Sequence, residues 1–169
     1  MTRHPGGREQ TLRLLALDRP APGASVLDLG AGDGESVRLL RALGFDALGV
    51  DKNAAPHVEA GNLLHTRFAD AAFDAVLSEC AFFLTGDVPG ALREAHRLLR
   101  PGGTLLLADV FFEPPEPLLE AAGFRPEQKE DLTEAWRAYY LRSIWEGTAE
   151  TCPTPKGKCQ YWMLTGRKI

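Results

Sequence analysis

The stretch SVLDLGAGDGESVRLL, residues Ser25 to Leu40, constrains the fold more than any other part of the sequence. Val26 to Leu29 is a short apolar run typical of a buried strand, and Ser36 to Leu43 has apolar residues at helical spacing. Between these two runs, glycine stands at every second position from Gly30 to Gly34. A strand that enters a helix through a glycine-rich turn is the opening unit of a βαβ fold. Such a turn can bring backbone N–H groups close to a ligand.

Strand-like runs and helical patterns continue to alternate after this unit. We predict strands in FDALGVD, FDAVLS, TLLLADV and CQYWMLTGRK, and helices near Arg8–Asp18, in DVPGALREAHRLLRPGG, in PLLEAAGF and over Leu132–Trp145. This alternation predicts an α/β fold with a Rossmann-like doubly wound sheet and right-handed crossovers. The aromatic residues of the Leu132–Trp145 helix are interpreted mainly as cover for the sheet.

The composition is that of an ordinary globular protein. The chain has 169 residues, of which 44% are hydrophobic and 25% charged, and this predicts a single domain over residues 1–169. The net charge of −4 gives no basic field for a nucleic-acid partner. Three cysteines, an odd number, favour reduced thiols over a disulfide framework. Since no apolar run reaches membrane-spanning length and no signal peptide is visible, we expect a cytoplasmic protein with no membrane partner.

The charges around the glycine turn bear on which ligand it holds. The dinucleotide pattern G-x-G-x-x-G would place its third glycine where Glu35 stands. Asp28, Asp33 and Glu35 put carboxylates where the phosphates of a dinucleotide would need to meet backbone N–H groups. S-adenosylmethionine carries an ammonium and a sulfonium group and no phosphate, so these acids favour it over a nicotinamide cofactor. Asp51, which ends the second strand, suits the ribose of either cofactor.

Four motifs in order, VLDLGAGDG, GVD, FDAVLS and RLLRPGGTLLLAD, resemble the core of class I S-adenosylmethionine-dependent methyltransferases over roughly residues 24 to 124. Within that class the chain is most similar to the methyltransferase type 11 group, with its ubiquinone-biosynthesis and arsenite methyltransferases. The resemblance implies a sheet of about seven strands, mostly parallel with an antiparallel C-terminal strand. It also implies methyl transfer from S-adenosyl-L-methionine to a small-molecule acceptor.

The same resemblance implies the cofactor-binding residues. Asp28, Gly30 and Gly32 match positions at the methionine end, and Asp51 matches the residue that binds ribose. Asn62 and Leu63 match the residues that flank adenine, although an acid is usual where Asn62 stands; its carbonyl oxygen can still reach the adenine amino group. The complete expected set is Asp28, Gly30, Ala31, Gly32, Asp51, Lys52, Asn62, Leu63 and Ser78.

The span after the second strand departs from the family pattern. Only about ten residues, with Pro56 among them, separate Asp51 from Asn62. The full helix that the family usually places there is therefore expected to be abbreviated to a turn. One edge of the sheet should then be thinly covered, which predicts either a homodimer contact or a loop that orders when the cofactor binds.

The segment SECAFF, after the FDAVLS strand, faces the methyl group in this family and is the expected catalytic region. Glu79 is either a general base or substrate contact, or a solvated residue at a strand end. Cys80 matches the segment that carries a metalloid-binding cysteine in arsenite methyltransferases, and Cys152 and Cys159 could complete a three-thiolate site. The plainer interpretation of Cys80 is a small buried hydrophobic residue.

Two further residues are candidates on the acceptor side. Tyr140 is expected to reach the acceptor pocket from the Leu132–Trp145 helix. Asp109, at the end of the TLLLADV strand, is a candidate for polarising the substrate. No resident metal is expected. Metalloid or thiol methylation through Cys80, a non-catalytic S-adenosylmethionine-binding accessory subunit, and a nicotinamide oxidoreductase are the alternative functions.

Overall fold

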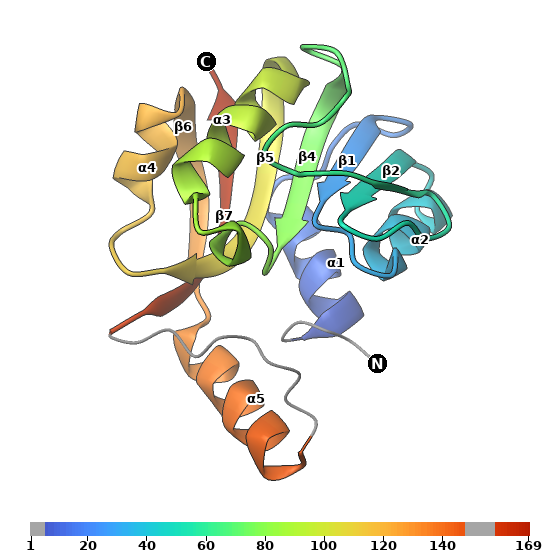
Figure 1. The fold of residues 1–169 in the computed structure, drawn as a ribbon. Helices are drawn as coiled ribbons and strands as arrows, with labels where there is room; N and C mark the ends of the chain where they lie inside the picture. The colour runs from blue at the N-terminus through green and yellow to red at the C-terminus, as the bar shows by residue number, and fades with distance from the viewer. Residues whose placement is uncertain (1–5, 148–157) are drawn as a thin grey trace.

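A seven-stranded sheet with the strand order β3-β2-β1-β4-β5-β7-β6 forms the middle layer of the fold (Figure 1). The computed structural model describes residues 6–147 and 158–169. The strands are β1 (Ser25–Leu29), β2 (Asp46–Asp51), β3 (Val58–Ala60), β4 (Phe73–Glu79), β5 (Leu99–Phe111), β6 (Phe124–Asp131) and β7 (Gln160–Lys168). β1 to β5 pair in parallel, whereas β7 runs antiparallel to both β5 and β6. The predicted fold class is confirmed.

Helices cover both faces of the sheet. They are α1 (Gly7–Leu17), α2 (Glu35–Ala42), α3 (Val88–Leu98), α4 (Glu116–Ala121) and α5 (Thr133–Trp145), with a short 3-10 helix, η1 (Phe83–Thr85). α1 and α2 pack on one face, and α3 and α4 pack on the other. Over residues 6–147 and 158–169, no helix has the length and apolar character needed to cross a membrane.

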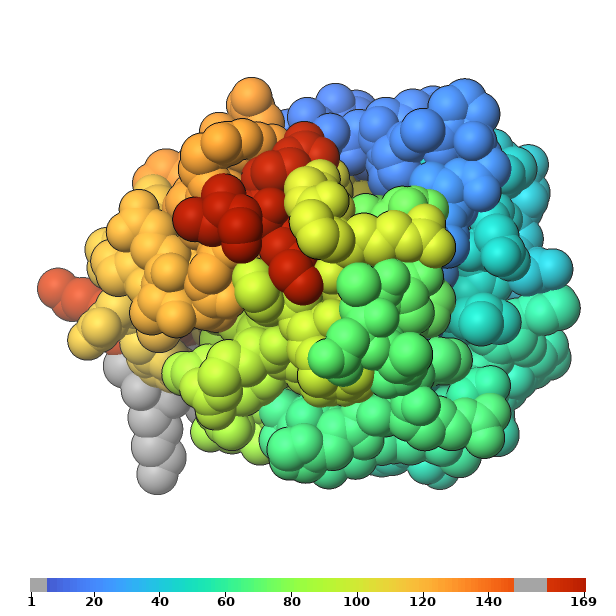
Figure 2. All heavy atoms as spheres, turned by 90° about the horizontal axis from the view of Figure 1, so that it is seen from above, coloured from blue at the N-terminus to red at the C-terminus, as the bar shows by residue number. Residues whose placement is uncertain are grey.

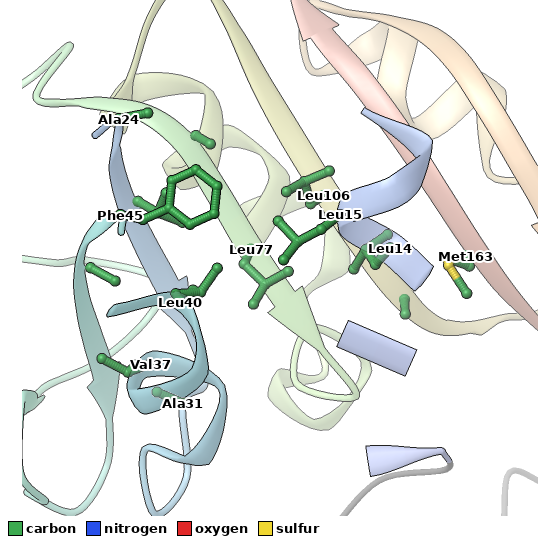
Figure 3. Close-up of a cluster of buried hydrophobic side chains, with 14 of the residues drawn as sticks. Leu14, Leu15, Ala24, Ala31, Val37, Leu40, Phe45, Leu77, Leu106 and Met163 are labelled. Atoms are coloured by element: carbon green, nitrogen blue, oxygen red, sulfur yellow. The ribbon is translucent and has the colours of Figure 1, made fainter. Parts of the chain in front are cut away.

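β5 shows why both faces of the sheet are apolar. Consecutive side chains of a strand point to opposite faces, so Leu106 joins the cluster under α1 while Leu105 and Leu107 join the cluster under α3. Figure 3 shows Leu15 of α1 beside Leu77 and Leu106. Burial on both faces explains the continuous apolar run by which this strand was recognised in the sequence.

β6 is a strand that the sequence pattern does not predict. It lies at the edge of the sheet and pairs with β7 alone, and most of its residues are exposed or half-buried. In Figure 2 the C-terminal end of the chain, in red, lies between the orange and yellow segments, as expected for β7 between β6 and β5. Because most of β6 contacts solvent, its polar sequence RPEQKED lacks the apolar alternation of a half-buried strand.

The connection between β2 and β3 contains no helix, as predicted. Ala55 and Val58 exchange two backbone hydrogen bonds of 3.1 and 2.9 Å, which close a tight turn around Pro56. The turn leads directly into β3, the three-residue edge strand. Both a homodimer contact at this edge and a loop that orders with the cofactor remain predictions.

The interpretation of α5 as cover for the sheet is wrong for most of the helix. Only Thr133 and Trp136, in its first half, are buried. Leu141 and Ile144 are exposed, and the Trp145 side chain is 92% exposed. Figure 1 shows the helix standing away from the carboxyl ends of the strands rather than lying on a face of the sheet.

Candidate functional site

A cleft of about 960 Å³ opens at the carboxyl ends of β1, β2 and β4. This volume is near the upper end of the range for small-molecule sites, roughly 300–1000 Å³. The lining residues include all but one of the expected cofactor-binding positions: Asp28, Gly30, Ala31, Gly32, Asp51, Lys52, Asn62 and Leu63. Ser78 is fully buried and donates a 2.7 Å hydrogen bond to the carbonyl of Leu29, so it fixes β4 to β1.

The glycine turn is held against the neighbouring strand ends. The N–H groups of Gly30 and Ala31 both donate to the carbonyl of Val50, at 2.8 and 3.1 Å. Gly30 has a φ of 91°, and a Cβ atom there would lie 2.1 Å from the Cβ of Ala81. Glycine is therefore required at position 30 by both backbone conformation and space.

Asp51 links the end of β2 to the glycine turn. Its Oδ2 accepts a 3.0 Å hydrogen bond from the N–H of Gly32, and its Oδ1 accepts one of 3.3 Å from Asn53. A carboxylate offers about four lone-pair sites. The fixed Asp51 side chain therefore keeps acceptor capacity for hydroxyl groups in the cleft.

Asn62 begins a short turn on the opposite wall. Its side-chain oxygen accepts a 2.9 Å hydrogen bond from the N–H of Leu64, and its backbone carbonyl accepts one from His65. The turn sets the orientation of the amide and uses one lone pair of its oxygen. The second lone pair and the amide N–H groups remain for a ligand.

The cleft is acidic. Among its described lining residues, the acids are Asp28, Asp33, Glu35, Asp51 and Glu79, and the only lysine or arginine is Lys52. Burial raises the pKa of the Asp28 carboxyl well above its ordinary value, and the nearby Glu79 and Asp51 carboxylates raise it further. A cationic ligand relieves this repulsion, whereas a pyrophosphate adds to it.

Glu79 is not a solvated residue at a strand end, because only 8% of its surface is exposed. Its carboxylate accepts hydrogen bonds from Gln10 Nε2 at 3.1 Å, Thr11 Oγ1 at 2.7 Å and Ser36 Oγ at 3.5 Å. Sequence reasoning missed Gln10 and Thr11. They lie on the same face of α1 as Leu14 and Leu15, and that spacing was the available signal.

Cys80 lies beside Glu79 on the wall of the cleft. Its Sγ is 3.1 Å from the hydroxyl of Tyr161, which also accepts a 2.9 Å hydrogen bond from Gln10 Nε2. Burial raises the pKa of Tyr161 well above its ordinary value, with Cys80 adding to the shift, so the hydroxyl remains protonated. Tyr161 is a third residue that the sequence analysis did not single out.

The three-thiolate arrangement is not assembled in the described part of the chain. Cys159 is buried in the apolar cluster under α1, and Cys152 lies outside the described residues. Within residues 6–147 and 158–169, no group of three His, Cys, Asp or Glu side chains is placed to hold a metal ion. Cys80 therefore contributes a single thiol to the cleft wall.

Asp109 lies beneath the cleft instead of pointing into it. Its Oδ2 accepts hydrogen bonds from the N–H groups of Phe82 and Phe83, at 2.8 and 3.1 Å. Burial raises its pKa to about 6. The carboxylate thus fixes the start of η1, which supplies Leu84 to the cleft wall. The idea that Asp109 polarises the substrate directly is wrong, because the side chain is fully enclosed.

Tyr140 does not line the cleft. Its ring stacks on Trp136 with a centroid distance of 5.9 Å, and Trp136 stacks on Tyr161 at 6.1 Å. Two rings therefore connect Tyr140 to the Tyr161 hydroxyl beside Cys80.

Comparison with known proteins agrees with this fold. The family described as "Methyltransferase domain" matches residues 27–107. An arsenite methyltransferase of Aquipseudomonas alcaligenes is 34% identical over 115 residues, which are 53% of this chain and 33% of that protein. The chain thus spans about a third of the length of this curated relative.

Solved structures share the fold at low sequence identity. Phosphoethanolamine N-methyltransferase 2 of Haemonchus contortus, with S-adenosylmethionine, has a TM-score of 0.77 and 19% identity over 98% of this chain and 53% of that one. The [4+2]-cyclase SpnF has a TM-score of 0.73 and 20% identity over 99% of this chain and 84% of that one.

The fold and cleft define a class I S-adenosylmethionine-binding domain. Residues 27–107 match the methyltransferase domain family, and the fold is that of S-adenosylmethionine-dependent methyltransferases. The choice of S-adenosylmethionine over a nicotinamide cofactor is therefore confirmed. The acids of the cleft and the Asp51 carboxylate fit this cofactor.

Proposed function

We propose that this protein transfers the methyl group of S-adenosylmethionine to a small-molecule acceptor bound at the Glu79 and Cys80 end of the cleft. The observation that carries the proposal is that this end and the expected cofactor residues line one continuous cleft. When bound, the cofactor supplies a methyl group on a positively charged sulfur. A displacement of this kind depends mainly on alignment of the two reactants and exclusion of water.

The chain's own residues divide the cleft into two ends. We assign Asp51 and Lys52 to the ribose, Asn62 and Leu63 to the adenine, and Asp28 with residues 30–32 to the methionine end; Ser78 supports this end by fixing β4 to β1. The orientation of the Asp51 side chain supports its assignment to the ribose, since the Gly32 N–H donates a hydrogen bond to one of its oxygens.

The Glu79 carboxylate is held in one orientation, in which we expect it to contact the acceptor. Gln10 and Thr11 hold its two oxygens, so the carboxylate cannot rotate freely. In this proposal Glu79 takes the proton when the acceptor's nucleophile carries one, or otherwise orients the acceptor. Tyr140 acts through the Trp136 stack as an outer support of this end.

Calorimetry with S-adenosylhomocysteine tests the cofactor half of the proposal. Tight binding to the wild type and loss of about tenfold or more in Asp51→Ala are expected, because a charged hydrogen-bond partner contributes about 1.5–3 kcal/mol. Asp46→Ala is the matched control, since Asp46 begins the same strand and is exposed. Equal loss in both variants, or no binding by the wild type, contradicts the assignment.

The acceptor half is tested by methyl transfer from labelled S-adenosylmethionine across a panel of small molecules. Turnover that falls about a hundredfold in Glu79→Gln supports the base role. Binding of S-adenosylhomocysteine without turnover on any acceptor supports the accessory-subunit alternative.

Metalloid or thiol methylation is the second candidate, because Cys80 lines the cleft and a relative is an arsenite methyltransferase. Arsenite-dependent methylation that disappears in Cys80→Ser supports it. Wild-type protein that is inactive on arsenite and thiols removes it.

A further inference from the structure

Several exposed apolar side chains come from segments that follow the carboxyl ends of the strands, where the cleft opens. Seven large hydrophobic residues are exposed within residues 6–147 and 158–169. Five of them follow the carboxyl ends of β4, β5 or β6: Leu84, Phe112, Leu141, Ile144 and Trp145. Exposed apolar side chains that are contiguous with a cleft are typical of a binding surface.

Three of the residues at this edge form an apolar rim continuous with the cleft. We define the rim as Phe83, Leu84 and Phe112. Leu84 lines the cleft and is 56% exposed, and Phe112 is 49% exposed. The rings of Phe83 and Phe112 are in contact, with centroids 5.9 Å apart.

The rim adjoins the end of the cleft assigned to the acceptor. Phe83 and Cys80 both pack against the apolar cluster that contains Tyr161. The Asp109 carboxylate fixes the rim by accepting the N–H of Phe83. The rim is therefore built in place, and a ligand that uses it needs to order little of the chain.

The charge of the cleft limits what such a ligand can carry. The Glu79 carboxylate lies at the acceptor end, and four further acids against one lysine line the rest of the described walls, so an anionic group on the acceptor would be repelled. We propose that the methyl acceptor is a molecule with an apolar aromatic or alkyl body and no anionic group. Its body rests on the rim and its nucleophile points towards Cys80. The inference rests on the proposed function and narrows its substrate class.

Probe binding to the S-adenosylhomocysteine-loaded full chain tests the inference without any need for turnover. Calorimetry compares phenol, 4-butylphenol and 4-butylbenzoate. We expect 4-butylphenol to bind about tenfold or more tightly than phenol, since each buried methylene adds affinity. We also expect it to bind about tenfold more tightly than 4-butylbenzoate, whose carboxylate meets the acids. Equal binding of phenol, or equal or tighter binding of the benzoate, overturns the proposal.

Variants test whether the apolar body of the probe binds on the rim. Phe112→Ser should weaken 4-butylphenol binding about fivefold, and Phe112→Leu should retain most of it, because leucine keeps an apolar surface. Ile169→Ser makes a similar change on an exposed residue and should have no effect. Ile169 follows β7, which runs antiparallel to β5, so it lies at the end of the strands opposite to the cleft. Wild-type affinity in Phe112→Ser, or an equal loss in Ile169→Ser, overturns the assignment.

Each variant's affinity for S-adenosylhomocysteine reports whether it has folded. That same affinity in the wild type tests the cofactor half of the proposed function, so failure there is distinct from an unexpected order of probe affinities.

Discussion

The hydroxyl of Tyr161 lies 3.1 Å from the Sγ of Cys80, at the point where the sheet meets the cleft. Tyr161 is on β7, and Cys80 directly follows β4, two strands away in the sheet. Gln10 of α1 joins the pair by donating to both the Tyr161 hydroxyl and the Glu79 carboxylate. Three separate parts of the chain thus fix the side chains at the acceptor end.

Removal of the Tyr161 hydroxyl should destabilise the protein. Tyr161→Phe leaves the buried Gln10 amide and Cys80 thiol each without one partner, and a cost of about 1–3 kcal/mol in the free energy of unfolding is expected. Urea denaturation measures it. Tyr140→Phe is the control, since Tyr140 is only partly buried and should lose less. Equal losses would show that the Tyr161 hydroxyl and its two hydrogen-bond partners make no special contribution to stability.

A turn can require glycine because of its backbone conformation or because there is no space for a Cβ atom, and Gly30 and Gly44 distinguish these two reasons. Both have a φ of 91°, but a Cβ at Gly30 would lie 2.1 Å from Ala81 while one at Gly44 would meet nothing within 4 Å. Gly44→Ala should cost about 1–2 kcal/mol from backbone strain alone. Gly30→Ala should cost about 1–3 kcal/mol more, because Ala81 must move.

Thermal or urea unfolding of the two glycine variants measures the cost of backbone strain and the added cost of moving Ala81. S-adenosylhomocysteine binding should be lost only in Gly30→Ala. If the two variants lose equal stability and both bind the ligand, the close approach of the turn to Ala81 is not a constraint.

The sequence could predict what depends on local pattern. The glycine turn directly follows one strand and Asp51 ends the next, and consecutive parallel strands bring their ends together, so the sequence alone assigns these residues to one cofactor. The pairing of Glu79 with Gln10 and Thr11 spans about 70 residues and joins a helix to a strand, and no periodicity encodes such a contact.

Tyr140 and β6 show two other limits of the sequence. The aromatic residues of α5 have the composition of a core helix, but the helix leaves the sheet after Trp136 and carries Tyr140 with it. β6 is polar because it is an edge strand, so hydrophobic alternation did not mark it. In both cases tertiary placement outweighed the local pattern.

The raised pKa of Asp109 predicts a stability that depends on pH. The folded state holds this proton up to about pH 6, while the unfolded state releases it near 3.8. The folded state therefore binds more protons between these values, and stability should fall as the pH rises from about 4 to about 6. Full burial makes the largest possible contribution about 3 kcal/mol.

Asp109→Asn removes this titration. Denaturation at intervals between pH 4 and pH 7 should give a slope that is less negative in the variant than in the wild type. Asp28, whose pKa is also raised by burial, contributes with the same sign in both proteins and cancels in the difference. Identical slopes would mean that Asp109 does not titrate in this range.

The partial burial of α5 predicts unequal stability along that helix. Trp136 is anchored on Tyr161, but Leu141, Ile144 and Trp145 have most of their surface in solvent. Backbone amides exchange fastest where few apolar contacts must be broken to open a helix. In hydrogen exchange, the second half of α5 should exchange about tenfold or more faster than α3, in which Ala91, Leu92, Ala95 and Leu98 are fully buried. Trp136→Ala should extend fast exchange to the first half of α5 and leave α3 protected. Uniform protection of α5 in the wild type would show that its exposed residues are covered in solution.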